Sequence, residues 1–206
     1  MKKYLSIINY GMGNLHSVIK SIQHLGIAAK LTDKRIDIEN SCGIVLPGVG
    51  AFRDAIKELR KRNLISLLKN QVKEGKPILG ICLGMQLLFS ESYEFGKYYG
   101  FNFIKGKVIR FKTKLKVPHI GWNQVEICKK SRLLSGIKNK SYFYFVHSYY
   151  CVPEDKNVVL TKTKYGNIIF ASGIADKNVF GFQFHPEKSG EIALKIYKNF
   201  FDICKN

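Results

Sequence analysis

Short apolar segments alternate with helix-like segments through the first 90 residues, and this alternation restricts the fold more than any other feature of the sequence. The candidate strands are residues 4–9, 28–32, 43–48 and 77–81. Residues 14–25 and 51–74 have the apolar spacing of helices, and the second helix is expected to break near Asn63. Strands that are apolar along their whole length and alternate with helices are typical of a parallel sheet buried on both faces. The pattern therefore predicts an α/β fold.

The sequence after residue 95 has a different pattern. Apolar and polar residues alternate in short runs such as 101–111, 141–150 and 157–174, which predicts largely antiparallel strands. Met85 to Ser90 is expected to be helical, and the chain is expected to close on an amphipathic helix with Ser189 as its N-cap. No repeat and no linker interrupts the chain. We therefore expect one domain over residues 1–206, with a mostly parallel central sheet flanked by helices and an added antiparallel region.

Composition limits the class of protein. A chain of 206 residues that is 46% hydrophobic can build a single core. It has neither the run of about 18 apolar residues that a membrane span needs nor the start of a secretory signal peptide, so we expect a cytoplasmic protein that does not bind membranes. The cysteines are scattered and never spaced C-x-x-C, so we expect no disulfide framework, no metal site and no cofactor. They are Cys42, Cys82, Cys128, Cys151 and Cys204.

The formal net charge of +19 raises the question of nucleic-acid binding. Most of the 34 basic residues are lysine, and they are spread along the chain. Base reading and phosphate binding favour arginine, and single-strand binding needs aromatic residues interleaved with the charge. We therefore expect no nucleic-acid partner. A solvated lysine surface that steers the chain toward an acidic partner is the better interpretation.

The segment GICLG places Cys82 where a strand ends and a helix begins. Glycines at positions 80 and 84 remove side chains that would clash in so tight a turn. This is the pattern of a nucleophile elbow with cysteine in place of serine. It presents the sulfur at the carboxyl edge of the sheet, where the helix N-terminus stabilises a thiolate. It also frees the backbone N–H of Leu83 to bind an oxyanion. A core cysteine between packing glycines is the alternative for this segment taken alone.

The segment FQFHPEK supplies a candidate base for that thiol. His185 precedes a proline, which favours an extended backbone, so residues 185 and 187 should point to the same side about 6 to 7 Å apart. The carboxylate of Glu187 can then orient the imidazole. Taken alone, the pair is also compatible with a histidine at the end of a strand and a carboxylate that caps the next helix. Together, the two segments favour a nucleophile, a base and an orienting group.

A dinucleotide site is a rival interpretation of the N-terminal region. Residues 11–13 read GMG after a strand, and Asp33 follows about 20 residues later. The third glycine of the nucleotide-binding motif is absent, because His16 stands in its place. This absence argues against a nucleotide cofactor.

Together, GICLGMQ and FQFHPEKS resemble the class I, or triad-type, glutamine amidotransferases. The segments NYGMGNLHSV, LPGVGAF, PHIGWN and FVHSYY are similar, within that family, to the glutaminase subunits of imidazole glycerol phosphate synthases. The resemblance covers residue 5 to about residue 200. It implies the amidotransferase α/β fold and hydrolysis of glutamine to glutamate and ammonia. A cysteine peptidase or other thiol hydrolase shares the elbow and the histidine, but it does not predict PHIGWN or FVHSYY.

The resemblance also implies a role for particular residues. Cys82, His185 and Glu187 would form the catalytic triad, and the oxyanion would be held by the N–H of Leu83 together with that of Val49 or Gly50. The implied glutamine-binding residues are Gln86, Ser148 and Tyr149, for which ordinary packing remains the alternative.

A cyclase partner is implied as well. In the resembling subunits the ammonia passes to a (β/α)8-barrel cyclase, so we expect a heterodimer whose interface includes His119, Trp122 and Lys188, although Trp122 in the core is the alternative. A second possibility inside the family is a paralogous glutaminase that supplies ammonia for an amidino-sugar of a surface glycan. The sequence also departs from many family members at Asn9, where they carry an acidic residue.

Overall fold

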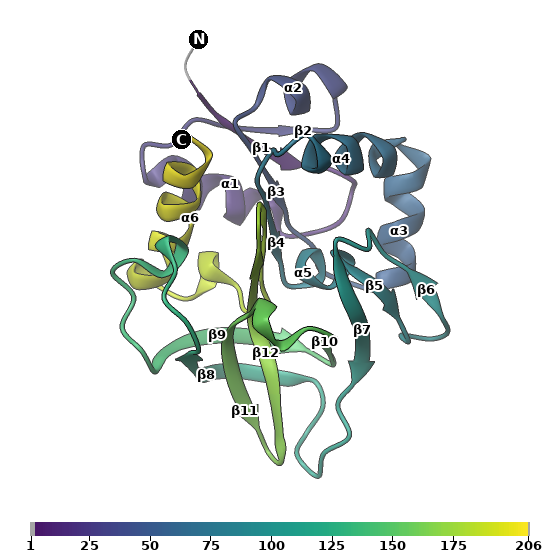
Figure 1. Ribbon diagram of the computed structural model, residues 1–206, viewed down its shortest axis with the longest axis vertical. Helices are drawn as coiled ribbons and strands as arrows, with labels where there is room; N and C mark the ends of the chain where they lie inside the picture. The colour runs from purple at the N-terminus through teal and green to yellow at the C-terminus, as the bar shows by residue number, and fades with distance from the viewer. Residues whose placement is uncertain (1–2, 206) are drawn as a thin grey trace.

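The computed structural model describes residues 3–205 and contains two sheets (Figure 1). The larger sheet has nine strands in the order β2-β1-β3-β4-β13-β12-β11-β8-β9, and the smaller has four in the order β10-β7-β5-β6. The strands are β1 (Leu5–Ile8), β2 (Ala29–Thr32), β3 (Gly43–Leu46), β4 (Ile78–Ile81), β5 (Phe89–Ser92), β6 (Tyr98–Tyr99), β7 (Ile104–Arg110), β8 (His119–Ile127), β9 (Ser141–His147), β10 (Tyr149–Pro153), β11 (Val159–Tyr165), β12 (Ile168–Asp176) and β13 (Val179–Phe182). The helices are α1 (Leu15–His24), α2 (Arg35–Asn40), α3 (Phe52–Lys61), α4 (Leu64–Lys73), α5 (Leu83–Leu87) and α6 (Glu191–Cys204), with 3-10 turns at Arg132–Leu134, Lys156–Val158 and Pro186–Lys188.

The parallel half of the large sheet is built from the apolar strands that the sequence predicts. Strands β2, β1, β3, β4 and β13 are neighbours and run parallel. Every residue of β1, β3, β4 and β13 is buried. This burial explains why these strands lack the polar alternation of a half-exposed strand.

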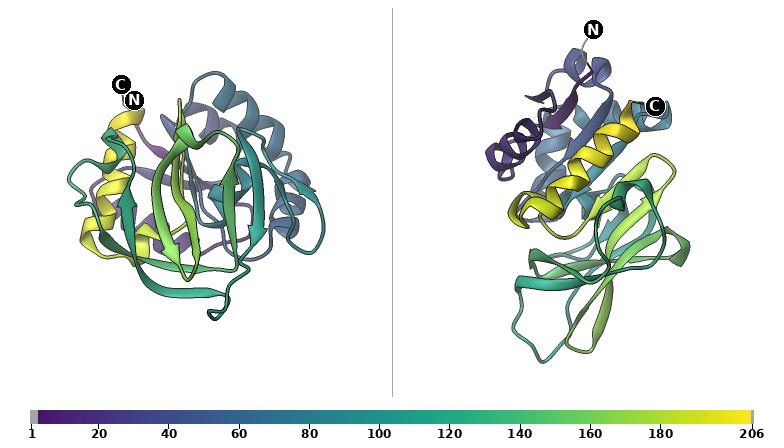
Figure 2. Two further views of the ribbon diagram at one scale, coloured as in Figure 1. Left: turned by 60° about the horizontal axis from the view of Figure 1, so that its bottom comes forward. Right: turned by 90° about the vertical axis from the view of Figure 1, so that its left-hand side faces the viewer.

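Helices cover both faces of this half. Helices α1 and α6 lie on one side of the sheet, and α3, α4 and α5 lie on the other (Figures 1 and 2). Helix α3 buries Phe52, Ala55, Ile56 and Leu59, the spacing of a single helix face. Asn63 adopts the left-handed conformation, with φ of 56°, and separates α3 from α4 as predicted.

The antiparallel half extends away from the helices, as the side view in Figure 2 shows. Strands β12, β11, β8 and β9 follow β13 across the sheet in that order, and each pairs antiparallel with the strand before it. Strand β13 pairs antiparallel with β12 on one side and parallel with β4 on the other. Strand β13 therefore joins the two halves of the large sheet. The segment FQFHPEK begins at its last residue, Phe182.

Two local predictions are wrong. The helix expected from Met85 to Ser90 ends at Leu87, and Phe89–Ser92 is β5 of the small sheet, because its backbone pairs with β6 and β7. Ser189 does not cap α6, whose N-cap is Gly190. The Ser189 hydroxyl instead donates to the His185 carbonyl at 2.6 Å and accepts from the Tyr144 N–H at 2.8 Å.

The described residues 3–205 include no helix long and apolar enough to cross a membrane. Within the same residues no group of three or more His, Cys, Asp or Glu side chains is arranged to hold a metal ion.

Candidate functional site

Cys82 occupies the sharp turn between β4 and α5. Its backbone is strained, with φ of 54° and ψ of −110°, a combination that L-residues rarely adopt. The Cys82 N–H donates to the Phe182 carbonyl at 2.7 Å, and the Cys82 carbonyl accepts from the Gln86 N–H at 3.2 Å to open the helix. These bonds to β13 and α5 hold the strained conformation in place.

The glycines around Cys82 are required by backbone contacts. A Cβ atom at Gly84 would lie 1.7 Å from the Leu46 carbonyl oxygen, and one at Gly80 would lie 2.6 Å from the Gly84 oxygen. A Cβ atom at Gly181 on β13 would lie 2.8 Å from Met85 Cγ. Close approach of β3, β4, β13 and α5 therefore depends on glycine, as predicted for positions 80 and 84.

His185 and Glu187 lie at the end of β13, beside Cys82. The His185 Nδ1 and Glu187 Oε1 atoms are 2.8 Å apart, and both side chains are only 2% exposed. The backbone between them forms a 3-10 turn rather than the extended chain expected from sequence, yet the two side chains still meet. The Tyr197 hydroxyl, from α6, donates to Glu187 Oε2 at 3.2 Å. The carboxylate is thus held from two sides.

The electrostatics of His185 follow from its neighbours. Burial disfavours its charged form, but the Cys82 sulfur and the Glu187 carboxylate outweigh burial and raise the pKa of His185 to about 10. Its Nε2 atom is buried and makes no hydrogen bond among the described residues. Since Nδ1 is engaged by Glu187, Nε2 is the nitrogen left to exchange a proton with the thiol.

A cleft of about 420 Å³ opens at Cys82. It brings together Leu83, Val49 and Gly50, the predicted oxyanion residues, and Gln86, Ser148 and Tyr149, the predicted glutamine-binding residues. Lys188 also lines this cleft. A larger cleft of about 920 Å³ lies between β5, β7 and β10, but it contains none of the predicted residues.

Sequence reasoning missed several residues of the cleft. Glu94 lines it, and its carboxylate accepts from the Phe52 N–H at 2.6 Å while burial raises the pKa of the group. Glu94 follows β5, whose first two residues were expected to end a helix, and no motif of the sequence includes Glu94. Pro118, Val146 and His147 also line the cleft. They lie inside the segments PHIGWN and FVHSYY, but the sequence analysis gives these three residues no role.

His119 and His147 form a buried pair beside the cleft. His119 Nδ1 lies 3.1 Å from His147 Nε2, and His147 Nδ1 lies 2.8 Å from the Tyr149 carbonyl oxygen. A carbonyl only accepts, so His147 carries its proton on Nδ1 and accepts at Nε2 from His119. Burial lowers the pKa of His119 to about 4 and that of His147 to about 3. Both rings are therefore neutral at pH 7.

The three predicted interface residues differ in exposure. His119 is only 3% exposed, so the prediction that it contacts a partner is wrong for its side chain, which is enclosed by Phe145 and Tyr165. Trp122 is 56% exposed, which rules out the core alternative for it. Lys188 is exposed as well, and its Nζ lies 5.8 Å from the centre of the Tyr144 ring.

The side chain of Asn9 makes a local contact. Its Oδ1 atom accepts from the Gly11 N–H at 3.2 Å, so the side chain shapes the turn that follows β1.

Comparisons with known proteins identify the family of the chain. Residues 6–204 match the family described as glutamine amidotransferase class-I. The chain is 50% identical over 201 residues to the imidazole glycerol phosphate synthase subunit HisH of Caldanaerobacter subterraneus subsp. tengcongensis, covering 98% of each chain. It is 49% identical over 195 residues to the subunit of the same name from Aquifex aeolicus, covering 94% of each.

Solved structures support the fold. The chain is similar to a crystal structure described as glutamine amidotransferase, with a TM-score of 0.78 at 18% identity, covering 98% of this chain and 99% of that one. The predicted fold class is thus confirmed by the family match, the structural likeness and the α/β architecture. With a family match over nearly its whole length and an activated-cysteine geometry in its cleft, the chain belongs to the class-I glutamine amidotransferases.

Proposed function

We propose that this protein is the glutaminase subunit of an imidazole glycerol phosphate synthase, which hydrolyses L-glutamine to L-glutamate and ammonia through Cys82, His185 and Glu187. The observation that carries the proposal is the position of His185. Its Nδ1 atom lies 2.8 Å from the Glu187 carboxylate, and both this carboxylate and the sulfur of Cys82 raise its pKa. Cys82 itself lines a cleft large enough for an amino acid.

The first half of the reaction forms a thioester. The Cys82 thiol gives its proton to His185 Nε2, and the sulfur attacks the carbon of the glutamine carboxamide. The resulting oxyanion is held by the N–H of Leu83 and by an N–H of the Val49–Gly50 segment. When the C–N bond breaks, His185 returns the proton to the leaving nitrogen, which departs as ammonia.

The second half regenerates the thiol. Water replaces ammonia and gives a proton to His185 Nε2 as its oxygen attacks the thioester carbon. The C–S bond then breaks, the proton returns to the Cys82 sulfur, and glutamate is released. Glu187, held by the Tyr197 hydroxyl at 3.2 Å, keeps the imidazole oriented through both halves.

The cleft also offers groups that suit the amino-acid end of glutamine. We assign Gln86, Ser148 and Tyr149 to glutamine binding, as the resemblance implies. Glu94 adds a carboxylate that can face the α-ammonium group of the substrate, since it lines the same cleft.

A partner subunit would receive the ammonia. The curated relatives are named as subunits of imidazole glycerol phosphate synthase, which supports a partner subunit for this chain. We infer that the partner is a (β/α)8-barrel cyclase of histidine biosynthesis, that the two form a heterodimer in the cytoplasm, and that Trp122 and Lys188 contribute to their interface. The amidino-sugar alternative is not favoured, because the relatives that match nearly the whole chain carry the synthase name.

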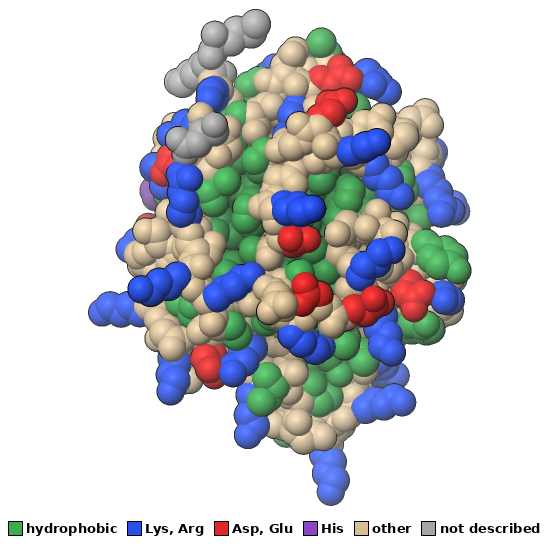
Figure 3. All heavy atoms as spheres, viewed as in Figure 1, with side chains coloured by type: hydrophobic (Ala, Val, Ile, Leu, Met, Phe, Trp, Pro, Cys, Tyr) green, Lys and Arg blue, Asp and Glu red, His purple; other side chains and the backbone are tan. Residues whose placement is uncertain are grey.

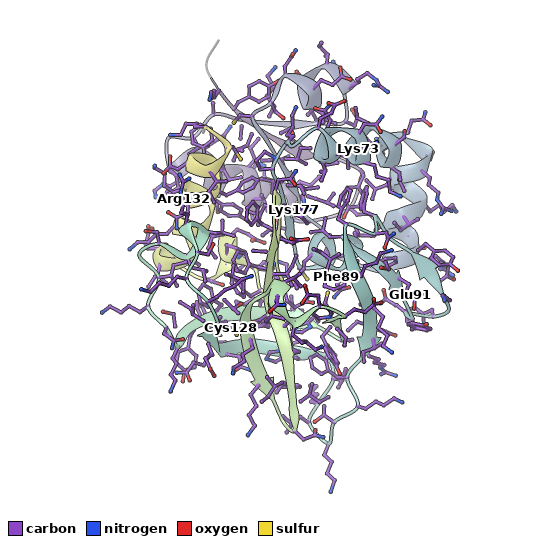
Figure 4. The ribbon with its side chains drawn as sticks, viewed as in Figure 1. Lys73, Phe89, Glu91, Cys128, Arg132 and Lys177 are labelled. Atoms are coloured by element: carbon purple, nitrogen blue, oxygen red, sulfur yellow. The ribbon has the colours of Figure 1, made fainter. Side chains whose placement is uncertain are left out.

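Replacing Cys82 by alanine tests the proposal. Cys82→Ala should lower ammonia release from glutamine to background in the complex with the partner, because no other group in the cleft can form the thioester. Cys128, an exposed cysteine just beyond β8, gives the matched control, and Cys128→Ala should keep full activity (Figure 4). Ammonia release by Cys82→Ala at the rate of the unmodified chain would refute the assignment.

A further inference from the structure

Gln183 lies against the nucleophile and has no role in the function proposed above. It follows β13, two residues before His185, and its side chain is completely buried. Its Nε2 atom lies 3.6 Å from the Cys82 sulfur, and its Oε1 atom lies 3.1 Å from Gln86 Nε2. A buried carboxamide between the nucleophile and a second carboxamide needs an explanation.

The orientation of both carboxamides is fixed by a backbone group. Gln86 Nε2 lies 3.1 Å from the Tyr149 carbonyl oxygen, which can only accept, so the nitrogen of Gln86 must face this carbonyl. The same nitrogen also donates to Gln183, which must therefore turn its oxygen toward Gln86. The remaining end of Gln183, its NH₂ group, faces the Cys82 sulfur as a donor.

The carbonyl of Tyr149 that orients Gln86 is itself held in place by a second donor. His147 Nδ1–H donates to the same Tyr149 carbonyl oxygen at 2.8 Å, so both lone pairs of that oxygen are used. The carbonyl cannot move without breaking a bond to Gln86 or to His147. The Gln183 backbone is held as well, because its N–H donates to the Ser172 carbonyl at 2.9 Å.

We propose that Gln183 is a further catalytic residue, whose side-chain N–H donates a hydrogen bond to the Cys82 sulfur and stabilises the thiolate, while Gln86 positions Gln183. The proposal rests on the proposed glutaminase function. When the thiol proton passes to His185 Nε2, the negative charge on sulfur strengthens the bond from Gln183. Gln183 thus acts on the sulfur from outside the triad, and it does so before glutamine binds.

The proposal separates two possible roles of Gln86. If Gln86 only binds glutamine, its replacement changes the KM for glutamine and leaves the free thiol unaffected. If Gln86 also positions Gln183, its replacement changes the reactivity of Cys82 without any glutamine present, because the Gln183 carboxamide is then free to turn its oxygen toward the sulfur.

The test is the rate at which iodoacetamide alkylates Cys82 in the full chain, without glutamine, over pH 6 to 10. Mass spectrometry of the peptide that contains Cys82 measures this rate. Gln183→Met should slow alkylation at pH 7 about tenfold, since a hydrogen bond to a charged group is worth about one factor of ten or more. The rate should recover toward that of the unmodified chain at high pH, where the thiolate forms without help. Gln86→Met should show the same pattern with a smaller effect, about threefold.

Gln71→Met is the matched control, because Gln71 is also buried but lies on α4 and donates to Glu74. It should leave the alkylation of Cys82 unchanged. If Gln183→Met fails to fold, as judged by its circular dichroism, Gln183→Leu replaces it, because leucine is also uncharged and close in volume and has no donor. Equal rates for Gln183→Met and the unmodified chain would overturn the proposal. So would a slowing of the same size at every pH, which would indicate altered access to the sulfur.

The outcome is independent of the glutaminase assay. A chain that releases no ammonia from glutamine refutes the proposed function whatever the alkylation series shows. A chain that releases ammonia but shows no effect of Gln183→Met refutes only the role of Gln183.

Discussion

At the scale of single residues, the contact between His185 and Glu187 has a measurable role. Glu187→Gln keeps an oxygen that can accept from His185 Nδ1 but removes the negative charge that stabilises the imidazolium. We expect kcat for glutamine hydrolysis in the complex to fall about tenfold to a hundredfold, which corresponds to the loss of one charge-assisted hydrogen bond.

Tyr197→Phe provides a graded comparison, because it leaves the carboxylate and removes only the hydroxyl that donates to it at 3.2 Å. Its effect on kcat should be a few-fold at most. Unchanged kcat in Glu187→Gln would contradict the orienting role of the carboxylate.

The buried histidine pair predicts acid sensitivity. The folded-state pKa values of His119 (about 4) and His147 (about 3) lie below the usual 6.5 because of burial. Between about pH 6.5 and these values the unfolded chain binds protons that the folded chain does not, so the free energy of unfolding falls as pH drops through this window.

His119→Phe removes one of these groups and keeps a ring between Phe145 and Tyr165. Between pH 7 and pH 4.5 the free energy of unfolding should fall by about 1 kcal/mol less in this variant than in the unmodified chain. This figure is reduced to allow for screening of His119 by solvent. Urea denaturation at the two pH values measures it, and carboxylates common to both proteins cancel in the comparison. An equal loss in both proteins would show that His119 does not contribute.

Much of the site was predictable at this scale, for a physical reason. Cys82 lies two residues from a glycine on either side, and His185 precedes a proline. Glycine permits a tight turn and proline restricts the backbone, so both mark turns in the sequence, and Glu187 is only two residues from His185. Glu94 and Gln183 were not predictable in the same way. Their roles depend on contacts with Phe52 and Gln86, which are far from them in the chain.

At the scale of the elements, the packing of α5 against β3 and β4 depends on Gly84. A methyl group there would lie 1.7 Å from the Leu46 carbonyl oxygen, so Gly84→Ala requires a shift of backbone rather than of a side chain. We expect the free energy of unfolding to fall by more than about 4 kcal/mol.

Gly26→Ala is the comparison for Gly84→Ala. Gly26 has φ of 70° at the end of α1, and apart from its chain neighbours no described residue has an atom within 4 Å of an added Cβ. Its replacement should cost about 1 kcal/mol, the strain of the left-handed backbone alone. Thermal or urea denaturation of both variants measures the difference, and equal losses would contradict the close-contact explanation.

The sequence predicted elements best where packing is uniform along the element. The strands β1, β3 and β4 are buried throughout, so apolar runs identified them without reference to partners. Strand β5 reads FSES and is short, and only its pairing with β6 and β7 makes it a strand. Strands β5 and β6 and the six-residue α2 helix were therefore missed, since their formation depends on neighbours that the local sequence does not specify.

At the scale of the whole molecule, the lysines remain dispersed. Figure 3 shows basic side chains spread over the whole visible face, interspersed with acidic ones except at its lower end, without a continuous basic stripe. This distribution fits the interpretation of a solvated surface better than that of a nucleic-acid site.

The exposed side chains of Trp122 and Lys188, with the half-buried Tyr144 ring between them in contact, form the surface that we expect to meet the partner. The Trp122 and Tyr144 rings are 6.4 Å apart, and Trp122 is 56% exposed. Trp122→Ala should weaken binding to the cyclase partner about thirtyfold, as for an interface residue at the centre of a contact. Calorimetric titration of the partner measures this affinity.

Ile36→Ala is the control for that loss. Ile36 is 61% exposed on α2, which lies at the opposite end of the molecule from β8 and β9 (Figure 1). Its replacement should leave the affinity unchanged. Equal affinities of Trp122→Ala and the unmodified chain would exclude Trp122 from the interface.

The strained backbone of Cys82 has a consequence for the stability of the molecule. Its φ of 54° costs about 1 to 2 kcal/mol for any residue with a side chain, and glycine alone avoids that cost. The turn therefore retains a conformational cost that the thiol requires, and glycine, which would relieve that cost, would also remove the nucleophile of the proposed reaction.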